Sequence, residues 1–379
     1  MRVPLAWLNL VHEKSRLVVA LAGVAFAVLL VFMNLGFLGA LAKSASVFYQ
    51  YMDADIFLTS PQSLEISTTK AFPRDRLYQA AGIKGIQRVM PLYLGYLQWR
   101  NPQTRNSRAV FMFAFNPQDP VFSLPDLNTP ATLAALDRPD TLLFDRLSRP
   151  EYGPKTIGTK TEVERRTVTI GGQYELGGGF AADATVIGSD QNFLRLLKIP
   201  LNLVNMGLVK LEPGADAQEI AAELRQVLPK DVVVRTKAEI IENDRSYWIT
   251  STSTGFIFGM GVAVSCVVGV VIVYQILYTD ISDHMKQYAT LKAMGYRSGY
   301  LFNVVIQEAF ILSILGYIPG LLSAVGLYAF AAKATNNALP IEMDLQRAIA
   351  VFILTVAMCV ISALISVRKV VTAEPVELF

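Results

Sequence analysis

Four long apolar runs constrain this chain more than any other feature of its sequence. They cover residues 17–41, 251–277, 300–332 and 348–367. A helix rises about 1.5 Å per residue and the hydrocarbon core of a bilayer is about 30 Å thick, so about 20 apolar residues can cross it. Each run is therefore predicted to form one transmembrane helix. The low charged fraction agrees, at 17% where soluble domains have about 25%.

Residues 42–250, between the first two runs, have the mixed composition of a folded domain. Its sequence patterns predict strands over 55–59, 89–99, 109–115, 167–170 and 207–211, and helices over 74–81 and 217–228. Segments 207–211, 217–228 and 231–235 have the order of a β-α-β unit, and 116–130 and 171–179 are predicted loops. The predicted fold class is a membrane protein of four transmembrane α-helices, with a large α+β domain inserted between helices 1 and 2.

Lysine and arginine in the short segments predict the orientation. Residues 1–16, 278–299 and 368–379 carry Arg2, Lys14, Arg16, Lys286, Lys292, Arg297, Arg368 and Lys369, whereas 333–347 carries only Lys333 and Arg347. Both termini and segment 278–299 are therefore predicted to be cytoplasmic, and the large domain and loop 333–347 to lie outside. Within this scheme, residues 1–16 are predicted to form an interfacial helix anchored by Trp7, and 368–379 a cytoplasmic tail.

Residue types that carry catalysis or metal binding are scarce. The two histidines, His12 and His284, both fall on the predicted cytoplasmic side, and Cys266 and Cys359 lie inside apolar runs. The domain therefore offers no histidine-based catalytic or zinc site, and we predict no catalytic residue, cofactor or metal in this chain. A site built on Asp, Lys or Ser stays open. The net charge of +3, with no basic run interleaved with aromatics, argues against nucleic acid as a partner.

The spans carry signals of close helix packing. Gly316 and Gly320 form a GxxxG pattern that contains Pro319, and Gly255 and Gly259 repeat at the same spacing. Small residues at this spacing let helix backbones approach closely, either within one chain or between two copies. Glu308, early in the third span, is a possible functional carboxylate, although its position near the cytoplasmic edge favours a structural role.

The segment between the second and third spans has the pattern of a short amphipathic helix. In 283–297 (DHMKQYATLKAMGYR), Met285, Tyr288 and Leu291 gather on one side, Lys292 interrupts that stripe, and Gly295 suits a helix end. An amphipathic helix held on the cytoplasmic side between two spans predicts a docking surface for a cytoplasmic partner.

The order of elements and several motifs resemble the FtsX/MacB-like permeases of ABC systems. The motif QYATLKAMG at 287–295 is similar to the cytoplasmic coupling helix of that family. Also similar are AWLNL at 6–10, QEA at 307–309 and AEPVEL at 373–378. Within the family, the resemblance is closest to the DevC permeases of the cyanobacterial heterocyst glycolipid exporter.

The resemblance implies a non-catalytic permease subunit that works with ATP and Mg bound on a separate ABC ATPase. The ATPase-coupling residues would be Met285, Gln287, Tyr288, Leu291, Lys292, Met294 and Gly295. Gln287 stands where the family usually has a glutamate, so an ion pair to the ATPase would become a neutral hydrogen bond.

Further partners implied by the resemblance are a second copy of the chain, a periplasmic membrane-fusion adaptor, an outer-membrane TolC-like channel and membrane lipids. The setting would be a bacterial, specifically cyanobacterial, inner membrane. The expected function is efflux of an amphiphilic substrate such as a glycolipid, driven by mechanotransmission into the periplasmic domain. The alternatives are a non-transporting, FtsX-like signalling protein and a membrane-anchored periplasmic enzyme.

Overall fold

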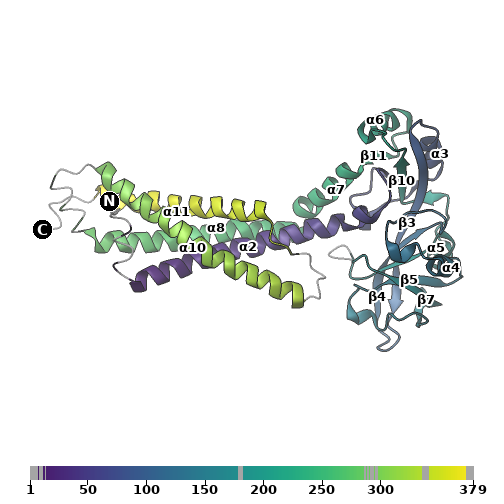
Figure 1. Ribbon diagram of the computed structural model, residues 1–379, viewed down its shortest axis with the longest axis horizontal. Coiled ribbons are helices and arrows are strands. Elements are labelled where there is room, and N and C mark those ends of the chain that lie inside the picture. Colours follow the sequence, from purple (N-terminus) through teal and green to yellow (C-terminus); the bar gives the residue numbers. More distant parts are fainter. Residues whose placement is uncertain are drawn as a thin grey trace. The chain divides into compact units, whose positions relative to one another are not determined.

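The chain divides into two compact units in the computed structural model (Figure 1). The structure describes Trp7, His12 and residues 14–177, 182–285, 287, 290, 294, 298–334 and 341–372. One unit, here the helical unit, comprises residues 1–40, 253–334 and 341–379. The other, here the sheet unit, comprises residues 41–252 and 335–340.

Four long apolar helices make up the described part of the helical unit. They are α2 (Lys14–Tyr51), α8 (Ser253–Asp283), α10 (Ser298–Ala334) and α11 (Leu345–Thr372). Each is long and apolar enough to cross a membrane, which confirms the prediction of four candidate spans. Within the unit, α8 and α11 run alongside one another and α10 crosses them obliquely (Figure 1).

All four helices continue beyond the ends predicted from the apolar runs, and α2 and α8 extend farthest. The second span was predicted to end at residue 277, but α8 continues to Asp283. The first was predicted to end at residue 41, but α2 continues to Tyr51, and its last eleven residues belong to the sheet unit. Phe48 and Tyr49 in that stretch are fully buried in the sheet unit's core. Hydropathy detects the residues suited to lipid, whereas the helix continues wherever its side chains find a packed environment.

The sheet unit is built on a nine-stranded mixed sheet of order β11-β1-β10-β3-β4-β8-β5-β7-β6. Its strands are β1 (Ile56–Thr59), β3 (Ile86–Arg100), β4 (Ser107–Phe115), β5 (Thr141–Asp145), β6 (Lys160–Val163), β7 (Arg166–Tyr174), β8 (Thr185–Ser189), β10 (Met206–Leu211) and β11 (Val233–Thr236). A separate pair joins β2 (Phe72–Pro73) to β9 (Leu203–Val204). Strand β3 also touches β6 through Trp99 and Val163.

Alternating side chains of the central strands create one core on each face of the sheet. Along β3, Tyr93 and Leu97 enter one core, and Leu92 and Leu94 enter the other. The first core is covered by α3 (Asp75–Ala81), α5 (Asp190–Leu197) and α6 (Ala217–Val227). The second is covered by α4 (Pro130–Leu136), α7 (Lys237–Ser246) and the end of α2. The predicted α+β character of the domain is thus confirmed.

Strand order departs from the predicted β-α-β unit. β10 and β11 do flank α6 in sequence, but β1 lies between them and pairs antiparallel with both. The local sequence predicts these two strands and the helix. Their neighbour in the sheet is β1, which lies about 150 residues earlier in the chain, so the local sequence does not predict it.

The predicted loop at 171–179 is wrong for its first four residues, which continue β7. Gly171 and Gly172 looked like loop residues, yet they allow close packing instead. A Cβ added to Gly171 would lie 3.0 Å from the Cβ of Ala135 in α4, and one added to Gly172 would lie 2.8 Å from Leu143 in β5. Glycine in a strand thus marks the close approach of a neighbouring element.

Candidate functional site

The GxxxG residues of α10 pack against α2 of the same chain. A Cβ added to Gly316 would come within 2.5 Å of Val24, and one added to Gly320 within 2.7 Å of Val28. Side chains do not tolerate such distances, so glycine is required for this helix contact. Of the two interpretations that the sequence left open for Gly316 and Gly320, the structure supports packing within one chain.

The second pair of small residues behaves differently. Gly255 is buried, whereas Gly259 is exposed, and a Cβ added there would meet nothing within 4 Å among the described residues. Lower on the same helix, a Cβ added to Gly269 would come within 2.8 Å of Met358 in α11. Close contacts within the chain thus use the Gly269 side of α8, and packing between copies remains an open prediction for Gly259.

Glu308 of α10 is fully buried within the helical unit. A carboxyl group that lies inside a helical bundle, and does not face lipid, is the usual arrangement for a membrane protein. Asn34 of α2 is another polar residue within a candidate span, and it donates to the Leu30 carbonyl at 2.9 Å and to Ser265 Oγ at 3.4 Å. It therefore bridges α2 and α8.

Only part of the predicted ATPase-coupling segment belongs to the described residues. Met285 is half-buried next to the end of α8, Gln287 is exposed, and Met294 is 64% exposed. The Met294 amide donates to the Thr290 carbonyl at 3.0 Å, which is a helical contact. Tyr288, Leu291, Lys292 and Gly295 lie outside the described residues. Their role in docking stays a prediction from the sequence.

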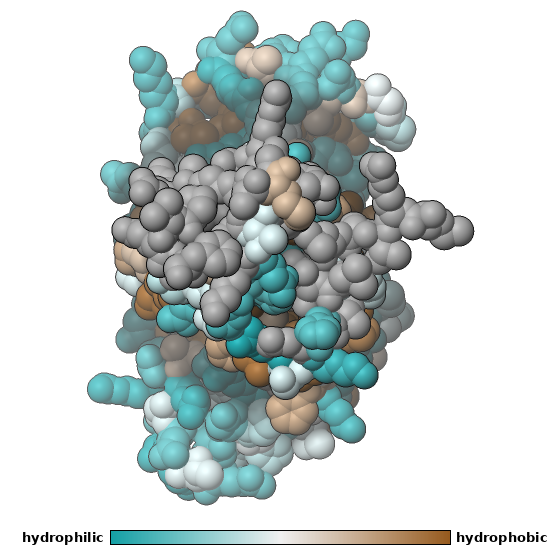
Figure 2. Space-filling model, turned by 90° about the vertical axis from the view of Figure 1, so that its left-hand side faces the viewer, coloured by the Kyte–Doolittle hydropathy of each residue, from teal (hydrophilic) through white to brown (hydrophobic). Residues whose placement is uncertain are grey.

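A group of charged side chains just before this segment was not singled out from the sequence. Arg16 at the start of α2 forms an ion pair with Asp283 at the end of α8. One turn earlier, Asp280 lies 3.5 Å from Nδ1 of the buried His284. The signal available in the sequence was a cation directly before one apolar run and two carboxylates directly after the next. Figure 2 views this end of the helices, where hydrophilic side chains lie among hydrophobic ones.

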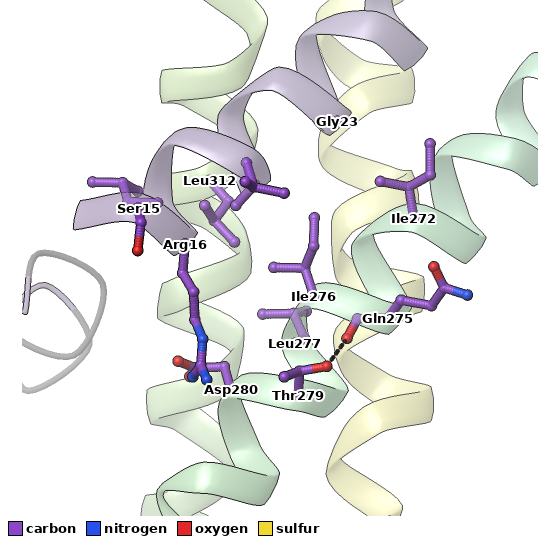
Figure 3. A pocket seen from close by; sticks show the side chains of 13 residues that line it. Ser15, Arg16, Gly23, Ile272, Gln275, Ile276, Leu277, Thr279, Asp280 and Leu312 are labelled. Carbon is purple, nitrogen blue, oxygen red and sulfur yellow. Dashed lines mark hydrogen bonds between the residues drawn. The ribbon is translucent and has the colours of Figure 1, made fainter. Parts of the chain in front are cut away.

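Beside these charges, α2 and α8 enclose a cleft of about 450 Å³ (Figure 3). Its walls are apolar over most of their length, from Leu17 and Ala20 of α2 to Ile272 and Ile276 of α8. Leu312 of α10 also lines it. The polar lining residues are Ser15, Arg16, Gln275, Thr279 and Asp280. The cleft thus combines an apolar interior with a charged group at its end.

The cleft lies next to a close contact between its two helices. A Cβ added to Gly23 of α2 would lie 2.6 Å from Ile272 of α8. Toward the start of α2 and the end of α8, Arg16 forms its ion pair with Asp283. In Figure 3 the Arg16 side chain extends from α2 toward Asp280 of α8. A volume of this size falls in the range of small-molecule sites, about 300–1,000 Å³.

The sheet unit contains buried carboxyl groups of its own, among them that of Asp244 in α7. Its carboxylate accepts hydrogen bonds from the Tyr49 hydroxyl at 2.7 Å and from the Ile66 amide at 3.0 Å. Asn243 Nδ2 donates to the other carboxylate oxygen at 3.2 Å. Burial, the largest cause, raises the pKa of Asp244 to about 6. Asp244 therefore joins the end of α2, the turn at Ile66–Thr68 and the helix that precedes α8.

Within the described residues, no group of three or more His, Cys, Asp and Glu side chains is arranged to hold a metal ion.

Comparisons with known proteins were made for sequence and for structure. Residues 259–375 match the family described as FtsX-like permease C-terminal. The comparison with curated proteins gave no match to this chain. The matched region contains most of α8 together with α10 and α11, so the similarity to this family covers three of the four candidate spans.

Three solved structures are similar to the chain at low identity. The periplasmic region of MacB from Actinobacillus actinomycetemcomitans is 12% identical and covers 51% of this chain and 92% of its own, with a TM-score of 0.37. The extracellular domain of the noncanonic ABC-type transporter YknZ from Gram-positive bacteria is 11% identical, covers 48% and 98%, and has a TM-score of 0.35. A permease-protein domain from Porphyromonas gingivalis is 14% identical, covers 48% and 89%, and has a TM-score of 0.34. These likenesses are too distant to bear on function.

Proposed function

We propose that this multi-pass inner-membrane protein, whose residues 259–375 match the FtsX-like permease family, is the membrane subunit of an ABC-type system. The observation that carries the proposal is the match of the helices after the large domain to a permease family. The layout agrees, with one span, a large α+β domain and three further spans. The permease itself is non-catalytic in this proposal, and ATP and Mg are bound by a separate ATPase.

Coupling to that ATPase takes place at 284–295, on the predicted cytoplasmic side. Two observations support this location. Met294 and Gln287 are exposed, and Met294 is a large apolar side chain available to a partner. The segment also directly follows α8, so that a force applied to it acts on a candidate span. Two copies of the permease would bind two copies of the ATPase.

The finer proposal is mechanotransmission to the large domain on the periplasmic side, followed by export of an amphiphilic substrate. A glycolipid is the substrate class that the DevC-like motifs favour. A periplasmic adaptor and an outer-membrane TolC-like channel would complete the export path, and the membrane would be that of a cyanobacterium. The burial of α2's last turns in the core of the sheet unit supports mechanotransmission, because α2 begins as a candidate span.

The coupling role is tested with Leu291→Asp and Gly295→Asp in the full chain. We expect both to abolish co-purification of the ATPase and its stimulated ATP hydrolysis, while the permease remains inserted in the membrane. Thr290→Asp is the matched control, because Thr290 falls on the polar side of the predicted helix. If both Asp variants retain full binding and stimulation, the segment is not the coupling site.

Export itself is tested by reconstitution of permease, ATPase and adaptor with a fluorescent glycolipid. Transfer of the glycolipid that depends on ATP supports the proposal. Hydrolysis that is stimulated by the permease without any lipid transfer would favour the alternative, a signalling protein that regulates a periplasmic partner.

A further inference from the structure

A pocket of about 260 Å³ within the sheet unit carries an inference that depends neither on the proposed export nor on an ATPase. The loop after β4, the short helix Pro125–Leu127 and α4 form it, and Arg88 of β3 lies at its rim. We propose that this pocket binds a free α-amino acid with a medium-sized apolar side chain, such as leucine. The apolar side chain lies in the pocket, the carboxylate is bound by Arg88, and the ammonium group is bound by Asp119.

The pocket lies where β3 changes its neighbour in the sheet. This strand pairs with β10 over Ile86–Leu92 and with β4 from Tyr93 onward. Because β4 ends at Phe115, the loop that follows it faces the first half of β3 across the pocket. Arg88 alternates along β3 with Met90 of the second core, so it lies on the face of the sheet against which this loop packs.

The loop that carries Asp119 has a fixed backbone. Asn116 Oδ1 accepts a hydrogen bond from the Gln118 amide at 3.1 Å, and the Asn116 backbone carbonyl accepts one from the Asp119 amide at 2.8 Å. A proline directly precedes Gln118 and another directly follows Asp119, which restricts the chain further. Beyond the second proline, the Val121 carbonyl accepts from the Asp53 amide at 2.9 Å. The backbone at Asp119 is therefore in place before a ligand binds.

The floor of the pocket is apolar. It consists of the buried side chains of Phe115, Phe122, Leu127 and Leu136. Water in this space would find few hydrogen-bond partners on the floor, so an apolar group is the favoured occupant. The volume is somewhat below the range of about 300–1,000 Å³ that is usual for sites of drug-sized molecules. It suits one branched apolar side chain whose polar groups stay at the rim.

Two opposite charges line the same pocket. Arg88 is exposed and Asp119 is half-buried, and neither forms an ion pair within 4 Å among the residues that the structure describes. Burial, the largest cause, raises the pKa of Asp119, and the charge of Arg88 lowers it. The two groups are thus near enough to interact, yet far enough apart for a ligand to lie between them. The partly desolvated carboxylate of Asp119 gains from a bound cation.

This pair of charges determines the polar part of the ligand. A ligand with only a carboxylate would be attracted to Arg88 but would bring a negative charge toward Asp119. A ligand with only an amine would be repelled by Arg88 in the same way. An α-amino acid carries a carboxylate and an ammonium group on one carbon, so it can form a charged hydrogen bond with each side chain.

Charged groups around the pocket leave this arrangement intact. Lys210 lies across the β3–β10 pair from Arg88, and it is bound to Asp53 at 2.8 Å. Arg74 and Asp190 also act on the pKa of the loop carboxyl group, in opposite directions. The lysine therefore has its own carboxylate, and the more distant pair consists of one charge of each sign.

The test is calorimetric titration of the full-length protein in nanodiscs with three ligands: leucine, leucinamide and N-acetyl-leucine. Leucinamide lacks the carboxylate, and N-acetyl-leucine lacks the ammonium group. We expect saturable binding of leucine at millimolar concentration or below. Each analogue should bind at least about tenfold more weakly, because it loses a hydrogen bond between charged groups.

Two variants separate the charges. Arg88→Gln should weaken binding of leucine about tenfold and leave that of leucinamide unchanged, because leucinamide has no carboxylate. Asp119→Asn should weaken binding of leucine by a similar factor and leave that of N-acetyl-leucine unchanged. Arg105→Gln is the matched control, because Arg105 is an exposed arginine between β3 and β4 that does not line the pocket.

Three results would overturn the proposal. They are the absence of saturable leucine binding to the unchanged protein, equal binding of leucine and both analogues, and equal leucine affinity of Arg88→Gln and Arg105→Gln. The exposed position of Arg88 makes Arg88→Gln a mild change for folding, so the variant stays informative. None of these measurements involves ATP or lipid transfer, so their failure would leave the proposed permease function untouched.

Discussion

The two units differ in how they satisfy their buried polar groups. In the sheet unit, the buried carboxylate of Asp145 accepts hydrogen bonds from groups as far away as Thr185 along the chain. In the helical unit, buried hydroxyls such as those of Ser313 and Thr355 donate to carbonyls of their own helix, three or four residues earlier. Polar side chains therefore position distant segments in the sheet unit.

In the helical unit, distant segments are positioned mainly by close contacts of small residues. Every helix already satisfies its own backbone, as a span must, so few polar groups are left to join one helix to the next. The exceptions are specific, such as the Ser362 hydroxyl of α11, which donates to the Val270 carbonyl of α8 at 2.8 Å. The comparison teaches that loss of one polar group should be costly in the sheet unit and cheap in the helical unit.

The largest effect is expected for Asp145→Ala. The change leaves the amides of Leu147, Leu176 and Gly177 and the Thr185 hydroxyl without their acceptor. Each buried donor left unsatisfied costs about 1–3 kcal/mol, and we expect a total loss of about 4 kcal/mol. Chemical denaturation of the purified protein measures it.

The control for this prediction is Asp126→Ala. Asp126 forms a half-exposed ion pair with Arg146 at 2.8 Å, and such pairs contribute less than about 1 kcal/mol. Similar losses for the two variants would contradict the importance of buried polar contacts in the sheet unit.

The next effect is a pH dependence due to Asp244. Its pKa is raised to about 6 from the ordinary 3.8, so the folded protein holds this proton more tightly than the unfolded chain. The contribution of Asp244 is therefore most favourable below pH 4 and is lost as the pH rises through 6. The total change is about 3 kcal/mol.

We measure this effect as the difference in stability between the unchanged protein and Asp244→Asn across pH 4 to 7. The other carboxylates cancel in that difference. We expect the unchanged protein to lose stability relative to the variant as the pH rises. Parallel curves would show that Asp244 does not titrate in this range.

In the helical unit, Gly316→Val should have the largest effect. The added side chain must displace Val24 of α2, and overpacking of this kind costs about 1–3 kcal/mol. Gly259→Val is the matched control, because a Cβ there meets nothing within 4 Å among the described residues. Unfolding in mixed micelles gives both values. Greater damage from Gly259→Val would instead identify its side of α8 as an interface between copies.

The smallest effect is expected for Ser362→Ala, which removes the polar link between α11 and α8. Hydrogen bonds between spans contribute about 0.6 kcal/mol on average. Ser323→Ala serves for comparison, since the exposed Ser323 donates to the Pro319 carbonyl of its own helix, at 2.7 Å. A loss above about 2 kcal/mol for Ser362→Ala would remove the contrast between the two units.

The sequence by itself determined the four candidate spans and most strands of the inserted domain. Each depends on a local property, either the length of an apolar run or alternation along a strand. It also predicted that Gly316 and Gly320 allow close packing, because that property belongs to the residue type. The coupling role of segment 284–295 stays a prediction from its amphipathic pattern and from the resemblance, because four of its seven named residues lie outside the described part of the chain.

Only the tertiary structure decided which segments meet. It inserted β1 between β10 and β11, extended α2 to Tyr51, and brought Tyr49 and Ile66 to Asp244. It also paired Arg16 with Asp283 and so revealed the cleft between α2 and α8. Ile66 and Asp244 are 178 residues apart in the sequence, and Arg16 and Asp283 are 267 residues apart. No local pattern can encode such a meeting, because it depends on how complete elements pack against one another.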